Sequence, residues 1–94
     1  MSSKRKLVSN YVRVFVGQDG GEIGFRPRRD EAGRLCWEVL GVHPDGTPEL
    51  VTSSNTGRPK ILRSADAVVS YWRGLYPDRS CLRLPVNPDT PDLT

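Results

Sequence analysis

The sequence has little of what most catalytic and metal sites require. It contains one histidine, His43, and two cysteines, Cys36 and Cys81. A structural zinc site takes about four nitrogen or sulfur ligands, and a catalytic nucleophile needs a neighbouring base that a third group orients. The acidic residues stand singly apart from the adjacent Asp30 and Glu31, so paired-carboxylate chemistry is not indicated. We therefore expect no enzyme, no metal site, no cofactor and no small-molecule substrate.

Long apolar runs are also missing from the sequence. No stretch approaches the ~20 apolar residues of a membrane span, and the N-terminal residues lack the apolar region of a signal peptide. Two cysteines in 94 residues are far fewer than a disulfide-rich secreted domain carries. These absences predict a cytoplasmic protein that does not contact a membrane.

The excess of positive charge is small. The formal net charge is +3, and the N-terminal residues Lys4, Arg5 and Lys6 supply that many positive charges by themselves. Between residues 7 and 86, eleven basic residues face nine acidic ones, which leaves an excess of two. Tight non-specific binding to nucleic acid is therefore not expected. Arginines outnumber lysines eleven to three, and a guanidinium group can bind a phosphate through two donors at once.

Residues 64–74 predict a helix. Ser64 is a favourable N-cap, Asp66 and Arg73 lie at the ends that the helix dipole favours, and Gly74 fits the left-handed position after the last turn. A single apolar stripe with spacing i, i+3, i+4 and i+7 marks the face toward the core. The residues of this stripe are Ala65, Val68, Val69 and Trp72.

Segments with the alternating pattern of strands flank this helix. We expect strands at residues 11–16, 22–26, 35–42, 49–53 and 81–86, with residues 60–62 as a candidate sixth. Residues 17–21 and 43–48 are rich in glycine, proline and aspartate and predict hairpin turns, and Pro27 is expected to end the second strand. The predicted core is Val12, Val14, Ile23, Phe25, Leu35, Trp37, Val39, Val68, Val69, Trp72 and Leu82.

These elements predict an α+β fold, a small antiparallel sheet of four to six short strands packed on a single α-helix in the order β-β-β-β-α-β. Residues 11–86 form one domain in this interpretation. Residues 1–10 would be a flexible basic arm, and residues 87–94, with two prolines and two aspartates, a disordered tail.

The basic residues give the strongest functional hypothesis, weak binding of DNA or RNA through arginine-rich loops and the N-terminal arm. The candidate nucleic-acid-binding residues are Lys4, Arg5, Lys6, Arg26, Arg28, Arg29, Arg34, Arg58, Lys60 and Arg63. Sheet-based readers of DNA show that a small antiparallel sheet can serve this purpose. A solvated surface of mixed charge is the simpler alternative. A second functional class is a protein-interaction or inhibitor module that uses a sheet edge together with Tyr71 and Tyr76.

Two segments resemble a known family. Residues 46–54 (GTPELVTSS) and 63–68 (RSADAV) are similar to the strand, loop and S-x-x-A helix start of small bacterial YegP-like domains, a pattern also found in short reading frames on mobile elements. The resemblance covers residues 35–75, and residues 53–59 and the N-terminal hairpin depart from it. It implies a compact antiparallel sheet packed on a helix and no settled activity, and it assigns no functional residue. Our functional hypothesis is a non-enzymatic binding module, a bacterial accessory or regulatory protein.

Overall fold

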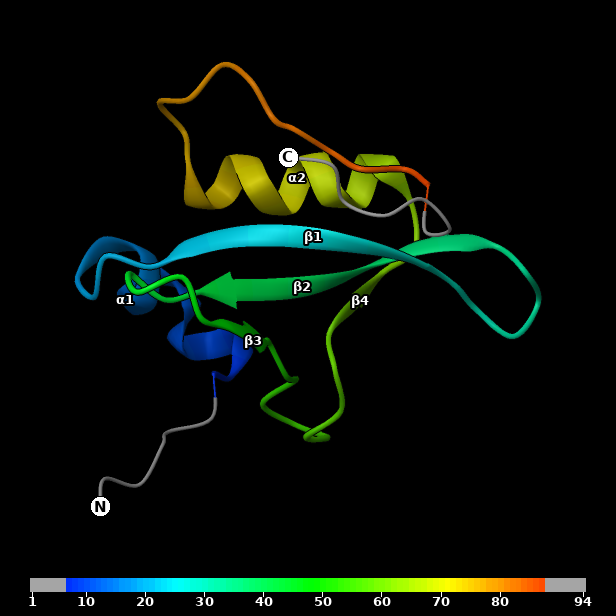
Figure 1. Cartoon of the computed structure of the whole chain (residues 1–94), viewed down its shortest axis with the longest axis horizontal. Coiled ribbons are helices and arrows are strands. Elements are labelled where there is room, and N and C mark those ends of the chain that lie inside the picture. The colour runs from blue at the N-terminus through cyan, green and yellow to red at the C-terminus, as the bar shows by residue number, and fades with distance from the viewer. Residues whose placement is uncertain (1–6, 88–94) are drawn as a thin grey trace.

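An antiparallel sheet with a helix packed along it forms the centre of the fold (Figure 1). The computed structural model describes residues 7–87. Its elements are η1 (Ser9–Tyr11), α1 (Val12–Gly17), β1 (Glu22–Arg29), β2 (Leu35–Val42), β3 (Pro48–Leu50), β4 (Ile61–Leu62) and α2 (Ala65–Leu75). The predicted α+β class, with four antiparallel strands against a helix, is confirmed. No helix in the described part of the chain is long and apolar enough to cross a membrane.

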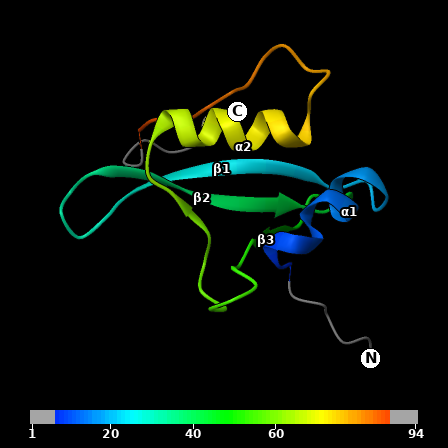
Figure 2. The ribbon, with the colours of Figure 1, turned by 180° about the vertical axis from the view of Figure 1, so that it is seen from behind.

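Strand β2 is the centre of the sheet. It pairs with β1 along its whole length, from Glu22↔Val42 to Arg29↔Leu35. On its other side, β3 pairs with its C-terminal end and β4 with its N-terminal half. The chain between β3 and β4 leaves the sheet as a loop and returns, as Figures 1 and 2 show.

The core lies between one face of the sheet and the helices. Side chains alternate between the faces of a strand, and Phe25, Trp37 and Val39 share the face that packs against Val68 and Trp72 of α2. The other residues of the buried cluster are Leu7, Val12, Phe15, Ile23, Val51 and Tyr76. Among the predicted core residues, Val14, Leu35 and Leu82 are only half-buried.

Helix α2 begins as the sequence predicts, since the Ser64 hydroxyl accepts a hydrogen bond from the Ala67 N–H at 3.0 Å. The helix continues to Leu75, so the prediction that Gly74 follows the last turn is wrong. The buried stripe is also shifted from the predicted one, because Val69 is 39% exposed. The residues that face the core are Val68, Tyr71, Trp72 and Leu75.

The predicted strand at residues 11–16 is wrong, because this segment forms η1 and α1. Its valines favour a strand locally, but Val12 and Phe15 are both buried and lie three residues apart, the spacing of a helix face. Residues 18–21 therefore connect α1 to β1, and the hairpin turn predicted at residues 17–21 is wrong.

The predicted last strand, residues 81–86, is also absent from the described chain. This segment runs back past α2 (Figures 1 and 2) and places Leu82 and Leu84 against the core. The indole Nε1 of Trp37 donates to the Pro85 carbonyl at 2.7 Å. The predicted order β-β-β-β-α-β is therefore replaced by two short helices, four strands and α2.

Several boundaries differ from the prediction. Strand β3 (Pro48–Leu50) ends three residues before the predicted end at residue 53. Strand β1 passes through Pro27 and ends at Arg29, because β1 is an edge strand, where a missing N–H costs no ladder hydrogen bond. The folded chain begins before residue 11, since Leu7 is buried and its carbonyl accepts from the Thr52 N–H at 2.9 Å. The predictions for residues 1–6 and 88–94 lie outside the described residues.

Candidate nucleic-acid interface

One face of the sheet carries no helix in the described part of the chain, and we call it the open face. Two glycines on neighbouring strands show the difference between the faces. A Cβ atom added to Gly24 on β1 would meet no described atom within 4 Å, whereas one added to Gly41 on β2 would overlap the Leu7 side chain. Around Glu38, the open face contains Gly24, Arg26, Arg28, Cys36, Leu40 and Ile61. Further along the strands, the register places Glu22, Val42, Pro48 and Leu50 on the same face.

The carboxylate of Glu38 binds two arginines on the open face. Arg26 lies directly opposite Glu38 in the strand register, and its Nε and Nη2 are each 2.7 Å from Oε1. Arg28, two residues further along β1, donates from Nη1 to Oε2 at 3.0 Å. Both carboxylate oxygens of Glu38 are therefore paired with a guanidinium group.

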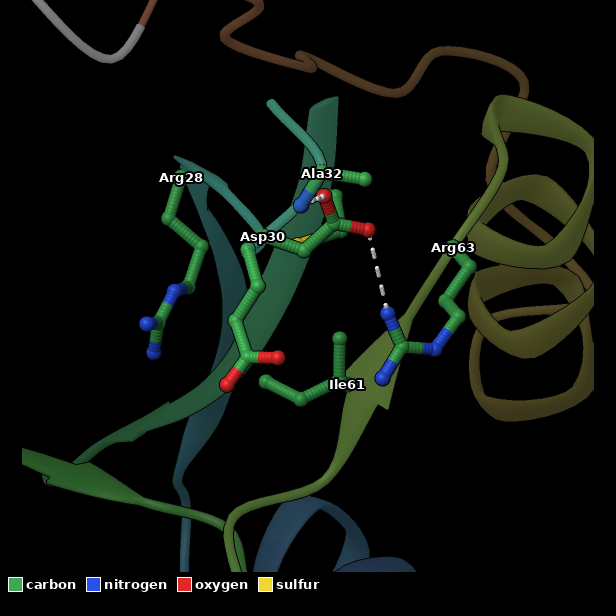
Figure 3. A pocket seen from close by; sticks show the side chains of 7 residues that line it. Arg28, Asp30, Ala32, Ile61 and Arg63 are labelled. Atoms are coloured by element: carbon green, nitrogen blue, oxygen red, sulfur yellow. Dashed lines mark hydrogen bonds and ion pairs between the residues drawn. The ribbon is translucent and has the colours of Figure 1, made fainter. Parts of the chain in front are cut away.

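Next to this group, the loop between β1 and β2 borders a hollow of about 460 Å³ (Figure 3). The residues around it are Arg28, Asp30, Glu31, Ala32, Cys36, Ile61 and Arg63. Arg28 from β1 and Arg63, which follows β4, stand on opposite sides of it. Arg63 Nη1 lies 3.4 Å from Asp30 Oδ2 and so connects the loop to the chain after β4.

Asp30 also organises the loop itself. Its Oδ1 accepts hydrogen bonds from the Arg34 and Ala32 N–H groups, both at 2.9 Å. The hydrogen bond from the Arg34 N–H, together with that from Ala32 and the charge of Arg63, holds the pKa of the Asp30 carboxyl below its ordinary value of 3.8. Asp30 therefore stays charged in neutral and mildly acidic solution.

The charges on the open face nearly balance in number, but they are not equally accessible. The side chains of Arg26 and Arg28 are 56% and 51% exposed, whereas that of Glu38 is 8% exposed. The Arg63 side chain is 69% exposed and its partner Asp30 24%. A ligand that approaches this face therefore meets N–H donors first and carboxylates beneath them. Glu31, an exposed acid beside the hollow, opposes this trend.

The structure brings together only part of the predicted basic set. Arg26, Arg28 and Arg63 surround the open face, while Arg29 donates to the Gly33 carbonyl at 3.3 Å within the loop. Lys60 lies on the helix side, with Nζ 5.6 Å from the centroid of the Tyr71 ring. Arg34 and Arg58 are exposed in the two loops that flank β2 and β4. Lys4, Arg5 and Lys6 lie outside the described residues.

The two tyrosines of the protein-interaction hypothesis belong mostly to the core. The Tyr71 ring packs edge-on against Phe25, with centroids 6.2 Å apart, and burial raises the pKa of its phenol to about 12. Tyr76 is buried, and its hydroxyl accepts the Ile23 N–H at 3.0 Å. This hydrogen bond occupies one backbone donor on the outer edge of β1, and Pro27 has no donor to offer there.

Sequence reasoning missed Glu38 as a site residue. The alternation of residues 35–42 places Cys36, Glu38 and Leu40 on one face, and this part of the prediction is confirmed. The sequence did contain a signal for Glu38, because Arg26 and Arg28 alternate in the same way on β1, the strand that pairs with β2. Asp30 and Ile61 were missed as well, because only the folded loop brings them to one hollow.

The comparisons with known proteins returned nothing: no family model, no curated protein and no solved structure matches this chain. The resemblance to YegP-like domains therefore stays a prediction.

Proposed function

We propose that this protein is a small, non-enzymatic module that binds duplex DNA weakly through the open face of its sheet. The observation that carries the proposal is the pair Arg26 and Arg28, whose guanidinium groups stand exposed over the buried carboxylate of Glu38. Guanidinium groups offer several N–H donors in a fixed plane, which suits both phosphates and base edges. A role as a bacterial accessory or regulatory protein stays a prediction from the sequence.

The dimensions of the β1–β2 hairpin support this proposal. Each strand has eight residues, and beyond β4, which pairs with Trp37 and Glu38, the end of the hairpin continues as two strands only. The major groove of B-form DNA is about 12 Å wide and admits a two-stranded ribbon. The deep, narrow major groove of an RNA duplex does not admit side chains in this way, so DNA is the better fit of the two nucleic acids.

The charge of the described chain limits the affinity. If four basic groups contact phosphates, the slope of log affinity against log salt should be about −3 to −4. Arg29, Arg34, Arg58 and Arg63 are exposed basic residues available for such contacts. We therefore expect binding that is measurable at low salt and lost at moderate salt.

A titration of labelled duplex DNA at several salt concentrations tests the proposal. The double variant Arg34→Ala, Arg63→Ala leaves both Arg26 and Arg28 on Glu38, and it should reduce the slope by about two units. The control Arg13→Ala, Arg73→Ala removes the same charge from α1 and α2, at exposed positions on the helix side, and should keep the wild-type slope. The proposal fails if folded wild-type protein does not bind at low salt, or if both double variants reduce the slope equally.

The protein-partner alternative has less support. Tyr71 and Tyr76 contribute mainly to the core, and the outer edge of β1 is partly occupied by the Tyr76 hydroxyl. Binding that barely responds to salt would favour this alternative, since burial of apolar surface is not screened by ions.

A further inference from the structure

We infer that Glu38 holds Arg26 and Arg28 in place so that the two arginines read guanine in the major groove. The inference rests on the proposed function and adds to it a sequence preference and a role for a buried carboxylate. It follows from the N–H donors of each guanidinium group that are bound to Glu38, and from those that are left over.

Arg26 presents its terminal donors to the outside. Its Nε and Nη2 both point to Glu38 Oε1, so one edge of the guanidinium plane is occupied. The end of the plane, with Nη1 and the second N–H of Nη2, remains for a ligand. Arg28 uses only Nη1 on Glu38 Oε2, which leaves its Nε and Nη2 edge for a ligand. Each arginine thus keeps a pair of parallel donors.

A pair of parallel donors matches guanine better than any other base. In the major groove, guanine presents two adjacent acceptors, O6 and N7, whereas adenine presents one acceptor and one donor. Guanidinium has no acceptor, so it cannot satisfy the adenine amino group. An arginine that is already fixed also loses less conformational entropy when it binds, and Glu38, with 8% of its side chain exposed, can fix both arginines without touching the base.

The spacing of the two arginines fits base pairs that are two steps apart. Residues two apart on a strand are separated by about 6.6 Å, and two base steps of B-form DNA span about 6.8 Å. Gly24, the next residue along the same face, leaves open space beside Arg26. We expect a preferred site with two guanines within three base pairs.

Selection from a pool of 24-base-pair duplexes with eight randomised positions tests this inference at low salt. The wild type should enrich pairs of guanines. Replacing the selected guanines with 7-deazaguanine, which lacks the N7 acceptor, should weaken binding by about 5- to 150-fold. Arg26→Lys and Arg28→Lys keep the charge but lose the paired donors, and each should reduce this discrimination while binding to random DNA persists. Glu38→Gln should also reduce the discrimination for guanine, but it should not lower the affinity for random DNA at low salt. This combination is expected of a residue that positions the arginines and does not contact the DNA.

The outcomes separate the inference from the proposed function. DNA binding without guanine enrichment, or enrichment that both lysine variants retain, overturns the inference and leaves DNA binding in place. A wild type that binds no duplex overturns both. If Glu38→Gln does not fold, the two lysine variants still decide the result, because their changes lie at exposed ends of side chains.

Discussion

The difference between the two faces of the sheet can be tested with one type of substitution at two glycines. Gly41 lies under the N-terminal segment, where an added Cβ would overlap the end of the Leu7 side chain and lie 3.0 Å from Phe15 Cε2. The Leu7 side chain has little room to move, since it is 3% exposed within the buried cluster, and its backbone is hydrogen-bonded to Thr52 and to the Glu49 side chain. Overpacking of this kind usually costs about 1–3 kcal/mol.

Gly24 is the matched control on the neighbouring strand. An added Cβ there meets no described atom within 4 Å, and alanine constrains the unfolded chain more than glycine does. We expect Gly24→Ala to raise the free energy of unfolding by about 0.5–1 kcal/mol, and Gly41→Ala to lower it by about 1–3 kcal/mol. In a domain of this size each kcal/mol shifts the melting temperature by roughly 4–8 °C.

Urea unfolding followed by tryptophan fluorescence measures both effects. A double-mutant cycle then connects the loss to its cause, because Leu7→Ala should cost less in the Gly41→Ala background than in the wild type. Additive effects of Leu7→Ala and Gly41→Ala would mean that the two residues do not touch. A destabilising Gly24→Ala would mean that the open face is covered, and the DNA-binding proposal would then lose its surface.

Three further predictions concern the core, the pH dependence and the hollow. Trp72→Ala should cost about 3–5 kcal/mol in urea unfolding, while Val69→Ala should cost less than about 1 kcal/mol because Val69 is 39% exposed; similar costs would contradict the observed helix face. The buried Tyr71 hydroxyl has no hydrogen-bond partner among the described residues, so Tyr71→Phe should keep or raise stability. Burial raises the pKa of Tyr71 from 10.0 to about 12, so the neutral phenol contributes stability below pH 10 that is lost as the pH rises through 12. Urea midpoints between pH 9 and 12 should fall less steeply in Tyr71→Phe, and equal curves would refute this. Glu31→Gln removes a carboxylate beside the hollow and should strengthen DNA binding at low salt, whereas weaker binding would show that Glu31 assists the ligand.

Much of the sheet and the main helix could be predicted because their signals are local. Ser64 caps α2 as expected, and the alternation of residues 35–42 matches β2 at both ends. The N-terminal segment could not be predicted in this way. Its valines alternate as in a strand, but the deciding contacts lie outside the segment, at Gly21 and at the distant Gly41, where the missing side chains make room for Phe15. Tertiary packing here overrides local propensity.

The strand predicted at residues 81–86 was wrong for a related reason. Leu82 and Leu84 alternate as in a strand, and both do turn toward the core. A strand also needs a free sheet edge to pair with, and this segment instead crosses to Trp37, whose indole N–H binds the Pro85 carbonyl. The alternation thus indicates which side chains are covered, but it does not indicate which groups the backbone hydrogen-bonds to.

The candidate site depends on the register of the hairpin, which no pattern within a single strand reveals. Asp30 accepts the N–H groups of Ala32 and Arg34, and Gly33 takes the left-handed conformation with φ of 81° that the turn requires. This loop sets Arg26 opposite Glu38. A shift by one residue would place Arg26 opposite a residue of the buried face. Asp30 therefore determines, through the loop, where Glu38 meets its two arginines. Asp30→Asn keeps an Oδ1 acceptor for both N–H groups and should retain the guanine preference, whereas Asp30→Ala removes the acceptor and should weaken that preference through the register.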